Sequence, residues 1–257
     1  IFPDGDTSTP VLTPDTLRLL GSSILASCDA DDGVEDGVMT DPRQCGFTPE
    51  DLPRCAGDSP GADCVTAEQL AAVKAVYDGP TANGEPLFFG FTYGGEDDRG
   101  GWDSWVVSSE QRIDQGVPNA HYGFGTELYK YFVFNDPDWD YTQYDFSTWR
   151  EDTAATAEIL NATDTDLSGF RDAGGKIIYW TGWSDLALTP LGTIDYYDRL
   201  HAGDVEARDY ARLYMLPGVL HCAGGPGPDR VDWVEAIRAW VEDGEAPERL
   251  VASKLDQ

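Results

Sequence analysis

The carboxy-terminal third of the chain alternates short apolar runs with helical patterns, and this order restricts the fold more than any other feature. Residues 176–181 read KIIYWT, a run bounded by glycines that is typical of a buried strand, and a helical pattern opened by Pro190 follows it. The run RLYMLP repeats the strand pattern, and residues 229–241 form a second helical pattern that ends at Gly244. Four apolar residues share one face of that second helix: Val231, Val234, Ile237 and Val241. Because consecutive strands joined by helices are parallel, the pattern predicts an open α/β sheet.

Two polar side chains follow the two predicted strands. In open α/β sheets, functional groups lie just past the carboxyl ends of the strands, and Asp185 and His221 each stand a few residues beyond one. Their order matches that of the α/β hydrolases, in which a buried carboxylate orients an imidazole and the imidazole deprotonates a serine hydroxyl. A lone histidine in a glycine-rich loop is more often a structural residue. Asp185 at the matching position favours the catalytic interpretation.

The sequence contains no recognisable nucleophile for this pair. Neither G-x-S-x-G nor Cys-Ser-x-Gly-Gly occurs, and Ser184 is not at a nucleophile elbow because no glycine follows it two residues later. We therefore expect the serine to lie outside these 257 residues. Taken alone, the chain should be nearly inactive by the triad route, since loss of the serine typically lowers turnover by a factor on the order of 10^6.

Five cysteines in an acidic, exported chain predict two internal disulfides and one cysteine left over. Cys28 with Cys45, and Cys55 with Cys64, would close short loops and contribute about 2 to 3 kcal/mol each. Cys222 then has no partner within the chain. It is either a reactive thiol or, as an oxidising compartment favours, half of a bridge to a segment outside the sequence.

The charge of the chain excludes two classes of partner. Its 47 acidic and 17 basic residues give a formal charge of -30, which repels nucleic-acid backbones and anionic lipid surfaces. No window approaches the roughly 18 to 20 apolar residues that cross a bilayer. The acidic, lysine-poor composition is typical either of a protein soluble in high salt or of an ordinary acidic secreted protein. We expect a secreted or periplasmic location, either after removal of a signal peptide or as part of a longer precursor.

The first two thirds of the chain contain two clear helical patterns and one aromatic segment. Residues 13–28 form the first pattern, and residues 66–79 form the second, which a Thr-x-x-Gln capping box opens. Residues 80–145 are rich in glycine and aromatics without sustained periodicity, so they predict loops and short elements. Such a segment suits a cap over a site, although any single ring is more often there to pack a core.

An acidic loop follows the first helical pattern. Residues 28–38 read CDADDGVEDGV, with carboxylates at Asp29, Asp32 and Asp36. Clustered carboxylates repel one another unless a cation neutralises them, and hard oxygen ligands favour Ca²⁺. The loop is not an EF-hand, because positions six and twelve lack the required Gly and Glu. On composition alone, a solvated Asp-rich turn is an equally good interpretation.

Several stretches together resemble the tannase and feruloyl esterase family, which includes mono(2-hydroxyethyl) terephthalate hydrolases. The resemblance runs essentially from Leu12 to Lys254 and rests on these stretches: CDADDGVEDGVMTDPRQCGF, VTAEQLAAVKAVYDGP, YFVFNDPDWD, LNATDTDLSGFRDAGGKIIYWTGWSDLALTP, TIDYYDRL, LYMLPGVLHCAGGPGPDRVD and WVEDGEAPERLVASK. It implies an α/β-hydrolase domain with a large inserted lid, a Ser-Asp-His triad, and a disulfide between the cysteine before the serine and the one after the histidine.

Carried over to this sequence, the resemblance implies roles for single residues. Asp185 would be the triad acid, His221 the general base, and Cys222 one half of the disulfide that ties the base to the nucleophile. A structural lid calcium would be held by three carboxylates and two carbonyls, those of Asp29, Asp32 and Asp36 and of Val34 and Val38. The family's amino-terminal portion, with the first strands, the oxyanion hole and the serine elbow, is absent from the sequence.

The expected organisation follows from this resemblance. Residues 1–27 would be a hydrolase segment leading into the lid, residues 28–165 the lid with its calcium loop and disulfides, and residues 166–257 the carboxy-terminal part of the α/β-hydrolase domain. A truncated sheet would expose a strand edge and apolar surface, so we expect association with the missing amino-terminal segment, with a second chain linked through Cys222, or with another copy.

The predicted function is a secreted serine esterase that cleaves esters of aromatic acids, such as gallate, ferulate or terephthalate monoesters, through an acyl-enzyme. The substrate partner would be a small aromatic ester. One alternative is a non-catalytic, calcium-stabilised binding or structural domain derived from such an enzyme. Another is a thiol-dependent hydrolase that uses Cys222, which is disfavoured because adjacent residues of one loop rarely aim at each other.

Overall fold

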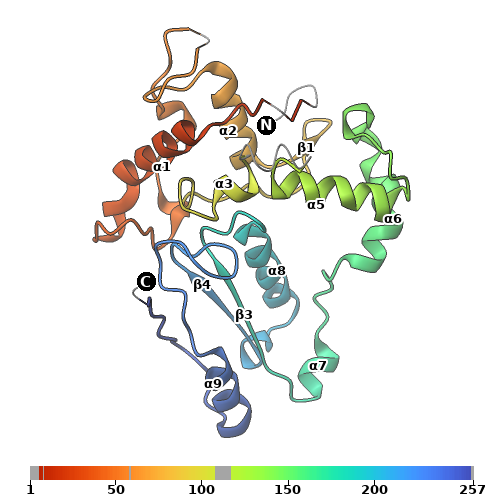
Figure 1. Cartoon of the computed structure of the whole chain (residues 1–257). Coiled ribbons are helices and arrows are strands. Elements are labelled where there is room, and N and C mark those ends of the chain that lie inside the picture. Colours follow the sequence, from red (N-terminus) through yellow and green to blue (C-terminus); the bar gives the residue numbers. More distant parts are fainter. Residues whose placement is uncertain (1–5, 8, 58, 108–116, 256–257) are drawn as a thin grey trace.

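The computed structural model describes residues 6–7, 9–57, 59–107 and 117–255. Figure 1 shows a helical amino-terminal part and a carboxy-terminal part in which two parallel strands lie beside helix α8. The helical part lies across the carboxyl ends of the strands, where the loops after β3 and β4 meet it.

The carboxy-terminal part contains the strand, helix and strand that the sequence predicts. Strands β3 (Ile177–Gly182) and β4 (Ala211–Leu216) pair in parallel along their whole length. Helix α8 (Pro190–Gly203) connects them, with the predicted proline at its first position. Side chains from the strands, the helix and the turn before β4 form a small core: Leu200, Ala207, Tyr210 and Ala211, with Ile177, Tyr179 and Tyr197 packed against them.

The last helix differs from its prediction. Helix α9 (Trp233–Arg238) begins four residues later than the pattern indicated, because the Asp232 side chain accepts from the Glu235 N–H and caps it there. A π-helical turn (Ala239–Asp243) continues it and ends at Gly244, as predicted. Its buried residue is Trp240. The expected valine face is largely exposed: Val234 is 77% exposed and Val241 58%.

The first two helices match their predictions closely. Helix α1 (Pro14–Cys28) starts with a capping box at Thr13, and helix α2 (Ala67–Asp78) starts with one at Thr66. The Gln69 side-chain oxygen accepts from the Thr66 N–H and completes the capping box of α2. The Gln69 side-chain NH₂ group donates to the Val11 carbonyl and so ties the second helix to the segment that leads into the first. The apolar faces of both helices belong to one buried cluster: Leu17, Leu20, Ile24, Leu70 and Val73, with Trp102 and Val106 from the aromatic segment.

Both predicted disulfides are present. Cys28 pairs with Cys45, and Cys55 pairs with Cys64. The first bridge closes the acidic loop at the end of α1, and the second closes a turn just before α2. Cys222 is free and exposed.

The aromatic segment is more regular than expected. Helix α5 (Ala120–Leu128) lies within the range predicted as loops and short elements. Asn119 caps it by accepting from the Tyr122 N–H, and its two glycines hide the helical periodicity in the sequence. A π-helical turn (Tyr129–Val133) follows. The rings beyond it pack on one another in a cluster that is half-buried or exposed and belongs to neither buried core: Tyr129, Phe134, Trp139, Tyr144 and Phe146.

The other elements are short, apart from one helix. The strands are β1 (Thr81–Ala82) and β2 (Glu85–Pro86), and the helices are α3 (Trp102–Trp105), α6 (Trp149–Leu160) and α7 (Ser168–Asp172). Single 3-10 turns cover Asp29–Asp32, Pro42–Gln44, Pro49–Asp51, Tyr141–Gln143, Phe146–Thr148 and Ala207–Asp209. Among the residues that the structure describes, no helix is both long enough and apolar enough to cross a membrane.

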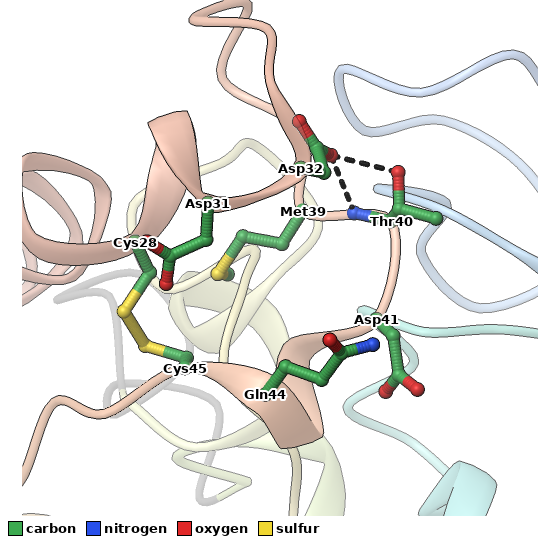
Figure 2. Close-up of a pocket in the computed structure, with 8 residues that line it drawn as sticks. All are labelled: Cys28, Asp31, Asp32, Met39, Thr40, Asp41, Gln44 and Cys45. Carbon is green, nitrogen blue, oxygen red and sulfur yellow. Dashed lines mark hydrogen bonds between the residues drawn. A yellow bond between two sulfur atoms is a disulfide. The ribbon is translucent and has the colours of Figure 1, made fainter.

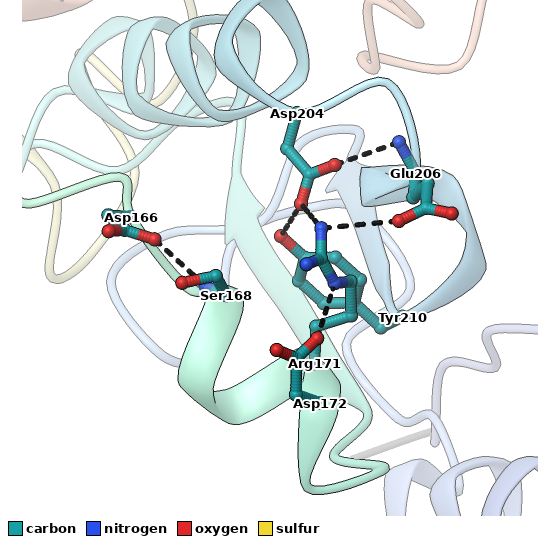
Figure 3. A network of polar contacts seen from close by, with 7 residues as sticks. All are labelled: Asp166, Ser168, Arg171, Asp172, Asp204, Glu206 and Tyr210. Atoms are coloured by element: carbon teal, nitrogen blue, oxygen red, sulfur yellow. Dashed lines mark hydrogen bonds and ion pairs between the residues drawn. The ribbon is translucent and has the colours of Figure 1, made fainter.

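An ion-pair network fixes α7 against the carboxy-terminal part (Figure 3). Arg171 on α7 pairs with its neighbour Asp172 and with Asp204 and Glu206, which lie between α8 and β4. The Tyr210 hydroxyl also donates to Asp204. The network therefore joins the segment that leads into β3 to the turn that leads into β4.

Candidate active site

Asp185 and His221 lie in contact past the ends of the two parallel strands. The His221 Nδ1 and the Asp185 Oδ2 are 3.0 Å apart. The strands bring them together because the pairing continues beyond their ends, where the Trp183 N–H donates to the Leu216 carbonyl and the Ser184 N–H to the Val219 carbonyl. Parallel strands in register place the loops that follow them side by side.

The loop that contains Asp185 fixes the direction of its carboxylate. Asp185 is 6% exposed, and its Oδ1 accepts from the N–H groups of Ala187 and Leu188 at 2.9 and 3.0 Å. The other oxygen faces the half-buried ring of His221. A carboxylate is an acceptor, so the Nδ1 of a neutral His221 holds the proton and its Nε2 is free to accept one.

The glycine-rich loop holds His221 by close backbone contacts. The Gly227 N–H donates to the Gly218 carbonyl, and the Gly224 N–H donates to the Asp229 carboxylate, which lowers the pKa of Asp229. Gly225 has a φ of +81°, and a Cβ there would lie 2.3 Å from the Gly218 carbonyl oxygen. The glycines are therefore required for this loop to fold back on itself.

Cys222 occupies an uncommon backbone conformation beside the histidine. Its φ is +65°, in the left-handed region that a residue with a Cβ rarely adopts. Its thiol is exposed and is not part of any disulfide between described cysteines. The residue after the candidate base is thus held at the surface in a strained conformation.

Aromatic residues from the helical part lie against the pair. The ring of Trp105 meets the His221 ring edge-on at 5.4 Å, and Phe124 of α5 stacks on Trp105 at 6.1 Å. Phe124 is 71% exposed, although it is a large apolar ring. Beyond it lies an apolar hollow of about 460 Å³, lined in part by Val117, Leu128 and Phe132.

Sequence reasoning named this aromatic segment as a cap but assigned no single ring to the site. The stretch GGWDSWVV gave no signal that Trp105, rather than Trp102, would face the histidine. In the structure Trp102 is fully buried in the core of the helical part, whereas Trp105 is partly exposed beside His221.

A buried carboxyl that the sequence did not reveal lies close to the same loops. Glu96 is 2% exposed and accepts from the Tyr77 hydroxyl at 2.8 Å and the Gly94 N–H at 2.7 Å. Burial raises its pKa to about 7, against the opposing effect of those hydrogen bonds. The cavity beside it, about 310 Å³, also borders Ser184 and Gly218, each three residues or fewer from the candidate pair.

The acidic loop closes on itself through its carboxylates. Asp29 accepts from the N–H groups of Asp36 and Gly37. Asp32 accepts from the N–H groups of Val34 and Thr40, and Asp36 accepts from that of Val38. Figure 2 shows Asp32, bonded to the backbone and hydroxyl of Thr40, beside a small cavity of about 100 Å³ near the Cys28–Cys45 bridge. The hydroxyl bond is the main reason why the pKa of Asp32 is lowered.

The fit of this loop to calcium rests on its donor chemistry. Carboxylate oxygens suit Ca²⁺, and each carboxylate has about four lone-pair sites, so the hydrogen bonds leave acceptor sites on all three aspartates. In the described part of the chain, however, no three His, Cys, Asp or Glu side chains are grouped as a metal ion would require. Calcium binding therefore stays a prediction.

The fold and the pair together define a class of protein. A carboxylate and an imidazole in contact past the ends of neighbouring parallel strands have the positions that the acid and the base take in α/β hydrolases. The family model for tannase and feruloyl esterase matches residues 3–257. The chain belongs to the tannase and feruloyl esterase family.

Curated relatives cover nearly the whole chain. It is 35% identical to a mono(2-hydroxyethyl) terephthalate hydrolase of Piscinibacter sakaiensis, over 92% of the chain and 44% of that protein. It is 33% identical to an uncharacterised esterase of Xanthomonas campestris pv. campestris, over 98% of the chain and 50% of that protein. The chain thus spans about half the length of the curated relatives it matches.

Solved structures have the same fold. An esterase from Aspergillus oryzae superposes on the chain with a TM-score of 0.79 and 26% identity, and the match covers 98% of this chain and 51% of the esterase chain. Feruloyl esterase B from Aspergillus oryzae gives a TM-score of 0.82 at 24% identity, over 98% and 51% respectively. At that identity the second likeness concerns the fold alone.

Proposed function

We propose that this chain supplies the acid and the base of a serine carboxylic-ester hydrolase that acts on esters of aromatic acids. The observation that carries the proposal is the contact between Asp185 and His221 at 3.0 Å, with the carboxylate fixed by its own loop. Membership of the family and the names of the relatives, esterase and mono(2-hydroxyethyl) terephthalate hydrolase, support the reaction class.

In the proposed reaction, the Nε2 of His221 removes the proton from a serine hydroxyl as the oxygen attacks the ester carbonyl. Asp185 stabilises the imidazolium that forms. The imidazolium then gives its proton to the departing alcohol, and an acyl-enzyme remains. His221 next deprotonates a water that attacks the acyl carbonyl and returns the proton to the serine. The serine belongs to polypeptide outside these 257 residues.

The aromatic surface beside His221 supports the substrate class. Trp105 lies against the imidazole with ring centroids 5.4 Å apart, and the exposed Phe124 stacks on Trp105, so the two rings form an apolar surface beside His221. An aromatic acyl group gains both apolar burial and ring stacking on such a surface, and a stacked pair adds about 0.5 to 1.5 kcal/mol. This geometry favours esters of benzoic or cinnamic acids over those of short aliphatic acids.

Cys222 belongs to the same proposal. We infer that it forms a disulfide with a cysteine next to the serine, so that the base and the nucleophile are covalently joined. Its exposure, its position directly after His221 and its left-handed backbone support this role. A thiol needed only for packing would not require that conformation.

We also propose a structural calcium ion at the acidic loop and a secreted or periplasmic location. The oxygen donors of Asp29, Asp32 and Asp36 support the ion. The two disulfides support an oxidising compartment. We also propose a lid at residues 28–165 with a hydrolase part on either side of it, which the position of the helical part across the strand ends supports (Figure 1).

The test is hydrolysis of methyl ferulate, methyl gallate and mono(2-hydroxyethyl) terephthalate by the complete gene product that contains this chain. The variant Asp185→Asn keeps the side-chain shape but removes the carboxylate that fixes the tautomer, so kcat should fall by roughly 10^4. Asp195→Asn is the matched control, since Asp195 pairs only with Arg199 on the surface of α8 among the described residues. It should leave kcat unchanged.

The other outcomes distinguish the alternatives. Hydrolysis that survives Asp185→Asn but is lost on alkylation of Cys222 would indicate a thiol-dependent hydrolase. Absence of turnover on all three esters, with a calcium-dependent melting temperature, would indicate a non-catalytic domain. Either result contradicts the proposed function.

A further inference from the structure

One short segment of the helical part, between β2 and α3, holds both ends of the loop that contains Asp185. At one end, the Thr92 hydroxyl of this segment donates to the Trp183 carbonyl at 2.5 Å. At the other end, the Thr189 hydroxyl donates to the Gly90 carbonyl of the segment at 2.6 Å. The side chains of Thr92, Trp183 and Thr189 are buried. We call the residues from Trp183 to Thr189 the acid loop, because Asp185 lies between its two bonded ends.

The segment is itself anchored to helix α2. The Phe91 N–H donates to the Val76 carbonyl at 3.3 Å. A Cβ at Gly90 would lie 1.8 Å from the Tyr77 carbonyl oxygen, so the segment passes the end of α2 in direct backbone contact. Helix α2 belongs to the buried cluster of the helical part. The acid loop is thus connected, through two threonine hydroxyls, to the core of that part.

The next turn of the segment lies against both loops of the candidate pair. A Cβ at Gly94 would lie 2.7 Å from the Ser184 Oγ. A Cβ at Gly95 would lie 2.8 Å from the Leu220 Cδ2. The backbone of the turn therefore contacts the residue directly before each member of the pair. The buried carboxyl of Glu96 fixes the turn by accepting from the Gly94 N–H.

Trp183 is the residue through which a displacement would reach Asp185. It stands two residues before the acid, and its N–H donates to the Leu216 carbonyl in continuation of the strand pairing. Its carbonyl is buried with the Thr92 hydroxyl as donor. A buried carbonyl that loses its donor is destabilised, so the backbone moves until another donor or a water molecule replaces it. Such a movement would change the direction of the carboxylate that follows.

We propose that Thr92 and Thr189 are positioning residues, whose hydroxyls hold the acid loop at its two ends and so fix the direction of the Asp185 carboxylate toward the imidazole. The inference rests on the proposed function for its effect on turnover, whereas the alignment itself is a property of this chain. It makes the packing of the helical part over the strand ends a condition for an aligned pair.

A purely structural role would give a different pattern. If the Thr92 hydroxyl only stabilises the fold, Thr92→Val lowers the free energy of unfolding and leaves the pair unchanged. If the hydroxyl positions the acid, Thr92→Val keeps the side-chain shape but misaligns the pair in folded protein, and Thr92→Ser, which keeps the hydroxyl, retains the alignment. Thr153→Val is the matched control, because the Thr153 hydroxyl donates to the Trp149 carbonyl at 2.7 Å within α6.

The experiment reads the tautomer of His221 by nitrogen-15 NMR of the 257-residue chain labelled on histidine, with urea denaturation to confirm that each variant is folded. The chain has three histidines, so single substitutions assign every ring signal. We expect His221 to be protonated at Nδ1 in the wild type, in Thr92→Ser and in Thr153→Val. It should shift toward the Nε2-protonated form in Thr92→Val and in Thr189→Val. Asp185→Asn gives the reference for a broken pair.

In the complete gene product, Thr92→Val should lower kcat by roughly 10^2 with little change in KM, since the substrate surface is kept and the alignment is lost. An unshifted tautomer in folded Thr92→Val overturns the inference, and so does a shift in Thr92→Ser as large as that in Thr92→Val. If Thr92→Val does not fold, Thr189→Val decides in its place by the same criterion.

The two readouts separate this inference from the proposed function. A tautomer shift in the valine variants, in a gene product that hydrolyses none of the esters, would retain the positioning role and contradict the proposed function. Normal ester hydrolysis by the wild type, with an unshifted tautomer in the valine variants, would do the reverse.

Discussion

At the scale of single residues, the site depends on how each polar group is held. Asp185 has one oxygen fixed by two backbone N–H groups, so the other has little freedom except to face His221. Glu96 is held just as firmly, but by a hydroxyl and one N–H in a buried position. The two carboxyls therefore differ in environment, and the environment of Glu96 should make the stability of the fold depend on pH.

Glu96 should make stability depend on pH in a direction unusual for a carboxylate. Its pKa is about 7 in the folded protein against an ordinary 4.5. Between these values the folded state retains the proton and the unfolded chain has released it, so the free energy of unfolding falls as pH rises through this window. Glu96→Gln keeps the acceptor oxygen without the charge. We expect it to match the wild type near pH 4 and to be more stable by about 3 kcal/mol above pH 8.

Urea unfolding at several pH values measures this difference. Glu158→Gln, at an exposed glutamate of α6, is the control and should show no such divergence with pH. A Glu96→Gln variant that is less stable than the wild type at pH 8 would mean that the charged carboxylate stabilises the fold, contrary to this account.

Some residues of the site were predictable from the sequence and others were not. Asp185 and His221 were expected to meet because each follows a strand, and a parallel register dictates where such residues lie. Trp105, Thr92 and Glu96 reach the site from the helical part. Their contacts depend on how that part packs over the strand ends, which no local pattern of residues specifies.

At the scale of elements, the acidic loop carries the prediction of calcium binding. If Asp29, Asp32 and Asp36 hold a calcium ion, chelation should lower the melting temperature, because a ligand that binds the folded state alone stabilises it. At a calcium concentration 100 times the dissociation constant, the gain is about 2.7 kcal/mol. Differential scanning fluorimetry with and without a chelator measures the shift.

Asp32→Asn should abolish the calcium-dependent part of the melting temperature. Glu35→Gln is the matched control, since Glu35 lies in the same loop but outside the predicted ligand set. The prediction fails if calcium raises the melting temperature equally in both variants, or does not raise it in the wild type.

The ion-pair network of Arg171 should stabilise the fold more than a surface network with the same number of partners. Arg171 joins α7 to residues 204 and 206, whereas Arg238 pairs with three acids of its own helical segment. Charge-assisted hydrogen bonds between separate elements contribute more to the free energy of unfolding than exposed ion pairs within one helix do. Arg171→Leu should lower the free energy of unfolding by more than Arg238→Leu does. Equal losses in urea denaturation would contradict this reading of Figure 3.

The elements also show where sequence patterns succeed and fail. Helices α1 and α2 were predicted well because capping boxes mark their starts. Helix α5 was missed since its two glycines interrupt the apolar period, and α9 was placed too early because its true cap, Asp232, lies within the pattern. The valines of the helix predicted over residues 229–241 had the right spacing, yet Trp240, in the π-helical turn after α9, is the buried residue.

At the scale of the whole molecule, the chain spans about half the length of the relatives that it matches. In the described part of the chain β3 pairs with β4 alone, and solved relatives superpose on the chain over about half their own length. A sheet of two strands offers an unpaired edge that further strands would cover. Under the proposed function, the nucleophile, the oxyanion hole and the rest of the sheet would lie in polypeptide outside these residues and would be joined to this part through Cys222.

The most direct test of the account labels the complete gene product with a fluorophosphonate probe and maps the modified peptide by mass spectrometry. We expect one labelled serine, located outside residues 1–257 and next to a cysteine that is disulfide-bonded to Cys222. We also expect that His221→Ala abolishes the labelling. Modification at Ser184 or at Cys222, or labelling that does not depend on His221, would contradict the account.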